Sequence, residues 1–255
     1  MSLSRKGLLD EMGLSPQWVL REASPNAHET KSAQRSDSQS IAIAQEAVQE
    51  NVPGVATSSV NVAQMDWPTL RQTIQECRAC GLCSKRRQAV PGVGDEQASW
   101  LFIGEGPGAE EDARGEPFVG QAGKLLDSML AAIDLARGED VYIANAVKCR
   151  PPGNRTPEAA EMAACWPYLR RQIDLIHPKL IVLLGKAAVF AVLGEEGSLA
   201  SLRGKSLAFR DGDVEIPVVV TYHPAYLLRN LPDKAKAWED LCRARQLMRG
   251  LTAVT

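Results

Sequence analysis

The chain has 255 residues, a net charge of −2 and a hydrophobic content of 45%, which is typical of a globular protein of one or two domains. No apolar run reaches the length of a membrane span and no signal-peptide core is present, so we expect no membrane partner and a cytoplasmic location, nucleoid-associated if bacterial. In that compartment the six cysteines indicate metal or cluster binding rather than disulfides.

The first 65 residues differ in composition from the rest. They hold five Lys or Arg and seven Asp or Glu. This excess of acidic residues accounts for the whole net charge of −2, so the remainder of the chain is neutral. Residues 21–65 are rich in Ser, Ala, Gln, Glu and Asn and contain no aromatic residue, so they cannot bury enough surface to offset their ordering entropy. We interpret residues 1–65 as a mostly disordered extension with short helices. A docking peptide for a protein partner, around Leu8 to Trp18, is the alternative.

From residue 66 onward, apolar strands alternate with helices. We expect strands at 100–104, 141–147, 180–184 and 216–221, and helices at 68–76, 121–136, 156–176, 186–193 and 233–248. Thr156 is the predicted N-cap of the long helix, with Pro157 at its first position. Residues 194–212 are predicted as loop with one hairpin. This order favours an α/β fold, in which helices cover both faces of a parallel sheet.

The stretch after the first strand carries the most information. It reads GEGPG at 104–108, then an acidic run at 110–112, then PFVG at 117–120. This combination of bare backbone, carboxylates and one aromatic ring suits a flat polar ring better than a phosphate. A Walker loop is excluded because Leu125 follows Gly123-Lys124, and the dinucleotide fingerprint lacks its third glycine.

Polar residues follow three of the four predicted strands. They are Glu105 after the first strand, Asn145 in the second, and His223 after the fourth. Because the carboxyl ends of parallel strands lie at one edge of a sheet, we expect these residues to line one pocket.

The cysteines suggest a shared inorganic group. Cys77 and Cys80 are spaced so that both thiolates can bind one metal centre. Cys149 and Cys165 are sixteen residues apart, a spacing that suits an iron–sulfur cluster better than a zinc ribbon. A fifth, Cys83, is an alternative to Cys80 as a ligand, and the sixth, Cys242, is interpreted as an inert core residue. The two candidate ligand pairs are Cys77 with Cys80 and Cys149 with Cys165.

Taken together, residues 67–250 resemble the family 4 uracil-DNA glycosylases, the iron–sulfur branch of the uracil-DNA glycosylase superfamily. The resemblance rests on the order and combination of several motifs rather than on any one of them. These are Cys77-x-x-Cys80, GEGPG with Glu111-Asp112, PFVG at 117–120, NAVKCRPP at 145–152, Asn154-Arg155-x-Pro157, Cys165, and HPAYLLR at 223–229.

The resemblance implies a three-layer α/β/α sandwich with a central four-stranded parallel sheet in residues 66–255. It implies a [4Fe–4S] cluster held by Cys77, Cys80, Cys149 and Cys165. It also implies a base excision repair enzyme, expected to act as a monomer, that removes uracil from single- or double-stranded DNA and leaves an abasic site. The alternatives are a non-catalytic iron–sulfur nucleic-acid-binding module of the same fold and a redox-sensing cluster protein.

Each site residue then has a predicted role in handling a flipped-out uracil. Phe118 stacks on the ring, Asn145 reads its edge, and His223 stabilises the leaving base. Glu105 positions water or stabilises the cationic sugar, and Glu111 either contacts the substrate or braces the loop. The backbone of the glycine loop, at Gly106 and Pro107, faces the base. Candidate phosphate contacts are Arg150, Arg155 and Arg229.

Overall fold

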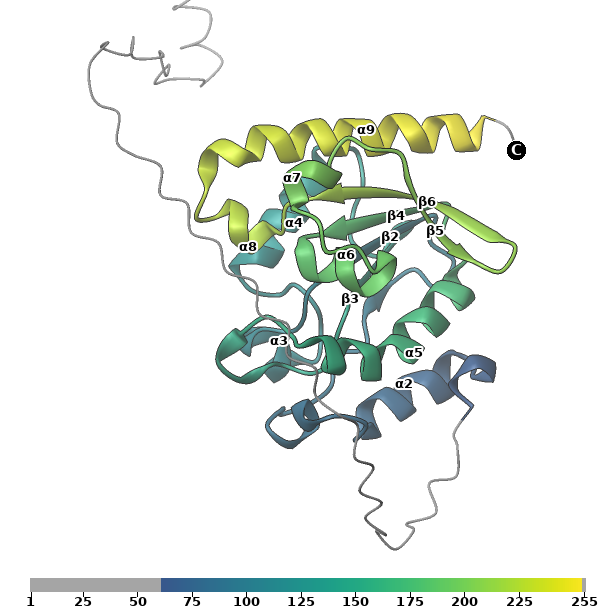
Figure 1. The fold of residues 1–255 in the computed structure, drawn as a ribbon, viewed down its shortest axis with the longest axis vertical. Coiled ribbons are helices and arrows are strands. Elements are labelled where there is room, and N and C mark those ends of the chain that lie inside the picture. Colours follow the sequence, from purple (N-terminus) through teal and green to yellow (C-terminus); the bar gives the residue numbers. More distant parts are fainter. Residues whose placement is uncertain (1–60, 254–255) are drawn as a thin grey trace, which may run out of the picture. The chain divides into compact units, whose positions relative to one another are not determined.

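The computed structural model divides the chain into two units, residues 1–55 and 56–255, and describes residues 61–253 of it (Figure 1). Residues 1–60 of the predicted disordered extension, 1–65, lie outside the described residues, and they include the docking peptide predicted around Leu8 to Trp18. Met65, which the sequence boundary at 66 places in the extension, is 7% exposed and packs in the domain. No helix between residues 61 and 253 is long and apolar enough to cross a membrane.

The described residues form a six-stranded sheet with the order β1-β3-β2-β4-β6-β5. Its four central strands are parallel, which confirms the predicted four-stranded parallel sheet. Two antiparallel edge strands, β1 and β5, extend it, and β5 forms a hairpin with β6. The strands are β1 (Val93–Gly94), β2 (Trp100–Gly104), β3 (Val141–Asn145), β4 (Leu180–Leu184), β5 (Leu207–Asp211) and β6 (Val214–Thr221).

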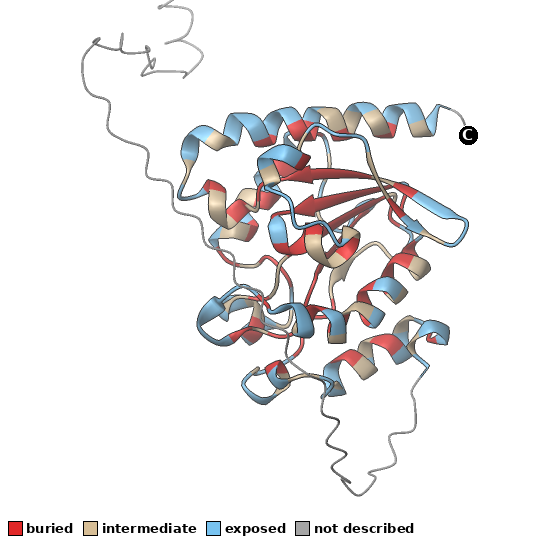
Figure 2. Cartoon of the chain, viewed as in Figure 1, coloured by how far each residue is buried: buried red, intermediate tan, exposed pale blue. Residues whose placement is uncertain are grey.

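Helices cover both faces of the sheet, which confirms the three-layer sandwich (Figure 1). Phe102 of β2 packs in a core with residues of α4 (Gln121–Ala131) and α9 (Lys234–Thr252). Its neighbours Leu101 and Ile103 pack in a second core with residues of α5 (Ala159–Ile176) and α6 (Lys186–Leu193). The side chains alternate between the two cores because successive residues of a strand point to opposite faces. Figure 2 shows the buried strands between the two helical layers.

Several helix boundaries differ from the sequence prediction. The α-helices are α2 (Trp67–Glu76), α3 (Ala109–Arg114), α4 (Gln121–Ala131), α5 (Ala159–Ile176), α6 (Lys186–Leu193), α7 (Leu199–Leu202), α8 (Pro224–Leu227) and α9 (Lys234–Thr252). Short 3₁₀ helices are η1 (Val62–Gln64), η2 (Gly81–Ser84), η3 (Pro152–Asn154) and η4 (Leu231–Asp233).

The predicted cap of the long helix was wrong. Helix α5 begins at Ala159, and its N-cap is Glu158, whose backbone N–H donates to the Glu161 carboxylate at 2.8 Å. This capping box shifts the start of the helix past Thr156 and leaves Thr156 and Pro157 in the wall of a pocket. Cys242 was also misassigned, because it is exposed on α9 rather than buried in the core.

Candidate active site

A pocket of about 620 Å³ opens at the carboxyl ends of the parallel strands. Residues from loops after β2, β3, β4 and β6 line it, so the geometry expected from the strand ends is present. The pocket contains all seven residues that the sequence assigns to substrate: Glu105, Gly106, Pro107, Glu111, Phe118, Asn145 and His223.

Gly104 brings two of these residues together at the end of β2. It pairs with Asn145 in the sheet, and a Cβ added at Gly104 would come within 2.5 Å of both the Asn145 Oδ1 atom and the Phe118 Cζ atom. Only a residue without a side chain leaves room for the amide and the aromatic ring at this place. The first glycine of GEGPG therefore determines how close the amide and the ring can lie.

Asn145 is 2% exposed at the end of β3, and its side chain is incompletely satisfied. Within residues 61–253, its Oδ1 atom has no hydrogen-bond partner. Its backbone carbonyl is anchored by the buried ammonium of Lys148, which donates to it at 2.9 Å and to the Gln172 Oε1 atom at 2.6 Å. A fixed, buried amide oxygen that lines a pocket and lacks a partner is ready to accept from an N–H group of a ligand.

His223 follows β6 and caps α8. Its Nδ1 atom accepts from the Ala225 backbone N–H at 3.1 Å, so the proton of the neutral imidazole lies on Nε2. Burial, with the nearby charge of Arg229, lowers the pKa of His223 to about 4, while the charge of Glu111 opposes this shift. The histidine is therefore neutral near pH 7 and presents one N–H donor.

Glu105 lies in the glycine loop beside Thr156. Burial raises the pKa of its carboxyl above the ordinary value, and a hydrogen bond with Thr156 works in the opposite direction. The sequence analysis missed Thr156 as a pocket residue because Thr-Pro is also a helix-start signal. Its hydroxyl instead helps to keep the Glu105 carboxylate in the charged state.

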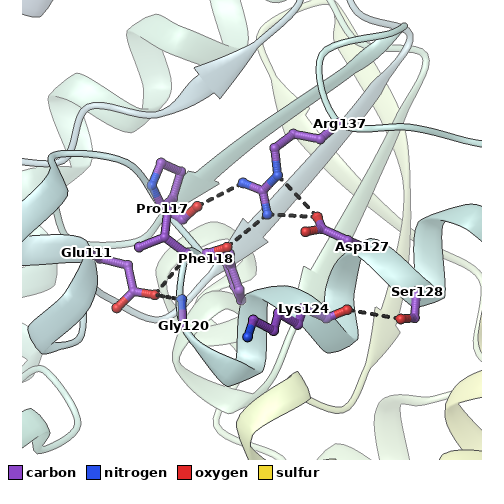
Figure 3. Close-up of polar contacts among 9 residues, drawn as sticks. Glu111, Pro117, Phe118, Gly120, Lys124, Asp127, Ser128 and Arg137 are labelled. Atoms are coloured by element: carbon purple, nitrogen blue, oxygen red, sulfur yellow. Dashed lines mark hydrogen bonds and ion pairs between the residues drawn. The ribbon is translucent and has the colours of Figure 1, made fainter.

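Glu111 holds the start of α3 and the PFVG segment together, and Figure 3 shows its bonds to the PFVG side. One carboxylate oxygen accepts from the Val119 and Gly120 N–H groups at 3.0 and 3.1 Å, and the other accepts from the Gly108 N–H at 3.1 Å. Of the two roles that the sequence left open for Glu111, these bonds correspond to bracing. They tie the start of α3 to the PFVG segment.

Phe118 is 5% exposed, and its ring lies beside that of His223 with the centroids 5.4 Å apart and an interplanar angle of 28°. Tyr222 and Tyr226 form a second aromatic part of the pocket wall, with ring centroids 5.1 Å apart. Sequence reasoning did not single out this pair, although both residues flank the predicted histidine. The pocket thus offers aromatic faces beside a few fixed polar groups.

The basic residues at the pocket differ in availability. Arg229 and Lys186 line the pocket, and the sequence analysis missed Lys186. Arg155 also lines the pocket, but its guanidinium forms an ion pair with the Glu161 carboxylate at 2.6 Å. This carboxylate offsets the positive charge that Arg155 could offer to a phosphate. Arg150 donates from Nε to the Asn154 Oδ1 atom at 2.7 Å and is not among the lining residues.

The four predicted cysteine ligands line a second, small cavity. N–H groups point at their sulfur atoms: the Arg86 guanidinium donates to Cys149 Sγ at 2.8 Å, and the Lys148 backbone donates to Cys165 Sγ at 3.3 Å. Burial raises the pKa of Cys165 to about 12, so binding of a cationic group there must displace its proton. Cys83 does not line this cavity.

The described chain has no group of three or more His, Cys, Asp or Glu residues arranged to hold one metal ion. Four thiols that line one small cavity supply the donor set that an iron–sulfur cluster requires. The donor set and the N–H groups directed at the sulfurs therefore fit an iron–sulfur cluster.

Comparison with known proteins agrees with this arrangement. The family model described as the uracil DNA glycosylase superfamily matches residues 91–242. The chain is 44% identical to a type-4 uracil-DNA glycosylase of Sulfurisphaera tokodaii, over 70% of this chain and 83% of the relative. It is 43% identical to the type-4 enzyme of Thermotoga maritima, over 70% of this chain and 92% of the relative. A type-5 uracil-DNA glycosylase of Pyrobaculum aerophilum is 31% identical, over 62% of this chain and 74% of the relative.

Proposed function

Since the chain belongs to the uracil DNA glycosylase superfamily, we propose that it is a base excision repair enzyme that hydrolyses the N-glycosidic bond of deoxyuridine in DNA. The observation that carries this proposal is the buried Asn145 amide, whose Oδ1 lacks a partner in the described chain and lies in one pocket with Phe118 and His223. The product is an abasic site and free uracil.

The first step is base flipping, because neither the Watson–Crick edge nor the C1′ atom of a stacked nucleotide is accessible. In our proposal Phe118 stacks on the flipped ring, which contributes roughly 1–3 kcal/mol. Asn145 accepts from uracil N3–H through its free Oδ1 atom and donates from its NH₂ group to O4. Cytosine has the opposite pattern at these two positions and leaves the amide unpaired, which costs about 1–3 kcal/mol for each unsatisfied group.

Bond cleavage places negative charge on the departing uracil, mainly at O2. We assign His223 to this oxygen because its Nε2–H is a donor in the neutral ring and its pKa of about 4 keeps it neutral. A donor fixed in a buried pocket stabilises developing charge without reorganisation. Loss of this bond by substitution of His223 is therefore expected to lower the rate rather than the binding of DNA.

Glu105 is the candidate for the sugar side of the reaction. As a carboxylate it can orient the attacking water or stabilise positive charge on the deoxyribose ring. The Thr156 hydrogen bond favours this charged form against the effect of burial. The backbone at Gly106 and Pro107 completes the wall next to Glu105.

We further propose that Cys77, Cys80, Cys149 and Cys165 hold a [4Fe–4S] cluster. Clusters of this kind can carry electrons, but hydrolysis requires none, so a structural role is favoured. Held this way, the segment after α2 is tied to α5 and to the segment that follows Asn145 at the end of β3. The proposals that the enzyme acts as a monomer and docks a protein partner through residues 8–18 rest on sequence alone.

A single assay tests the function. Purified protein is incubated with single- and double-stranded oligonucleotides that contain one uracil, and the products are treated with alkali. Strand cleavage at uracil, absent with thymine in its place and abolished in a His223→Ala, Asn145→Ala double variant, is the expected result. Binding of the oligonucleotide without cleavage would instead support the non-catalytic module.

A further inference from the structure

Phe118 has an unusual backbone for an aromatic residue. Its φ is +55°, in the left-handed region where a side chain with a Cβ is disfavoured. Strained conformations of this kind persist only where the surrounding structure holds them, and they are frequent at functional sites. The ring that we assign to stacking on uracil is therefore presented by a turn that depends on its neighbours.

Arg137 holds the carbonyl side of this turn (Figure 3). Its guanidinium donates to the carbonyls of Pro117 and Phe118 at 2.8 and 2.9 Å. The same guanidinium donates twice to Asp127 Oδ1, from Nε at 3.1 Å and from an Nη atom at 2.8 Å. The planar fork thus uses four N–H groups at once, which a lysine ammonium cannot reproduce.

Two other features hold the same turn. The Glu111 carboxylate accepts from the N–H groups of Val119 and Gly120, which follow Phe118 directly. Gly123, in the first turn of α4, approaches so closely that a Cβ there would overlap the Phe118 carbonyl. The carbonyls are therefore held from one side and the amides from the other, and Arg137 is the cationic half of this clamp.

Arg137 is not one of the residues that line the pocket. It lies in the tight turn between α4 and β3, where the Glu139 N–H donates to the Ala136 carbonyl at 3.2 Å. Its side chain is 24% exposed, so solvent can stabilise the guanidinium charge without a buried counter-ion. Four directed hydrogen bonds from a partly exposed arginine indicate a constraint on geometry rather than neutralisation of a buried charge.

We propose that Arg137 is a positioning residue for base excision, which fixes the left-handed turn at Phe118 and so places the ring against the flipped uracil. The proposal rests on the proposed function, because it assumes that Phe118 stacks on the base. Arg137 touches neither substrate nor reacting atoms, and its effect passes entirely through Phe118.

The test is a double-mutant cycle on purified protein. Single-turnover excision from a uracil oligonucleotide and inhibition by free uracil are measured for wild type, Arg137→Ala, Phe118→Ala and the double variant. We expect Arg137→Ala to lower the single-turnover rate constant of excision about 10- to 100-fold, because a displacement of about 1 Å in a positioned group can cost 10²-fold. Inhibition by uracil weakens in parallel. In the Phe118→Ala background the same substitution has no further effect.

Two variants serve as controls. Arg137→Lys keeps the charge without the fork and is expected to lose nearly as much activity as Arg137→Ala. Arg210→Ala removes another arginine that pairs with a carboxylate, Glu215, on the β5–β6 hairpin, and is expected to match wild type. If Arg137→Ala does not fold, Asp127→Ala replaces it in the cycle. Asp127 is half-exposed, so Asp127→Ala removes one anchor of the Arg137 guanidinium without creating a buried cavity. We expect a smaller loss of excision rate, which likewise disappears in the Phe118→Ala background.

The outcomes separate the two proposals. Wild-type activity in Arg137→Ala, restoration by Arg137→Lys, or an equal loss with and without Phe118 would overturn the positioning role while leaving uracil excision intact. Absence of uracil excision in wild type, or a Phe118→Ala variant as fast as wild type, would overturn the proposed use of Phe118 and the positioning role together.

Discussion

Changing Asn145→Asp tests base reading at the residue on which the proposed function depends. The substitution keeps the shape of the side chain but replaces the NH₂ donor with a second acceptor. In the wild-type protein the Oδ1 atom lacks a partner in the described residues, and the backbone is anchored by Lys148. The new oxygen therefore cannot easily turn away, and it faces uracil O4 without a proton between them.

The magnitude follows from two unsatisfied acceptors, one on the protein and one on the base. Each costs about 1–3 kcal/mol when buried, so the pair costs about 2–6 kcal/mol. Because about 1.36 kcal/mol corresponds to a tenfold change in rate, uracil excision is expected to fall between about 30-fold and about 26,000-fold. A carboxylate can accept from the cytosine amino group, so residual activity is expected to shift towards cytosine. Asn145→Ala loses uracil activity without this gain.

The assay is excision from matched duplexes that carry uracil or cytosine opposite guanine, followed by alkaline cleavage. A thermal melt of each variant checks that the fold is kept, since the side chain is almost completely buried. If Asn145→Asp removes uracil at a rate close to wild type, Asn145 does not read the base. The pocket assigned from the ends of β2, β3 and β6 would then need another reader.

Three further predictions test the cluster, the acid and the extension. Replacement of Cys77, Cys80, Cys149 or Cys165 by alanine should abolish the brown colour of the protein and its content of about four iron atoms. Cys83→Ala and Cys242→Ala should keep both. The measurement is iron analysis of anaerobically purified protein. Glu105 acts as a carboxylate with a raised pKa, so kcat/KM should fall as the pH drops through that pKa. Glu105→Gln should remove this fall at low pH from the pH–rate profile. Because the pKa of His223 is about 4, His223 should add no inflection to the profile near pH 6.5. Deletion of residues 1–60, which contain few apolar residues after Leu20, should leave the excision rate and melting temperature unchanged, and a large drop in melting temperature would contradict that interpretation.

The sequence alone was sufficient for the central part of the fold. Residues 100–104 and 180–184 are apolar runs of strand length, and such runs report directly on a buried parallel sheet. The edge strands were harder to predict: β1 has two residues, and β5 is recognised only through its pairing with β6. The pocket residues Glu105, Asn145 and His223 could also be predicted, because each stands at the end of a strand or within two residues after it.

Tertiary structure decided what supports those residues. Thr156 has a hydrogen bond to Glu105 rather than a capping role, because Glu158 and Glu161 form the capping box of α5 instead. Arg137 stands in an ordinary polar turn of the sequence, and nothing in its neighbours indicates that it binds the carbonyls of a strained turn nineteen residues earlier. Local sequence determines backbone preferences within a few residues. Which distant hydrogen-bond donors reach a given carbonyl is determined only when the sheet and its helices pack together.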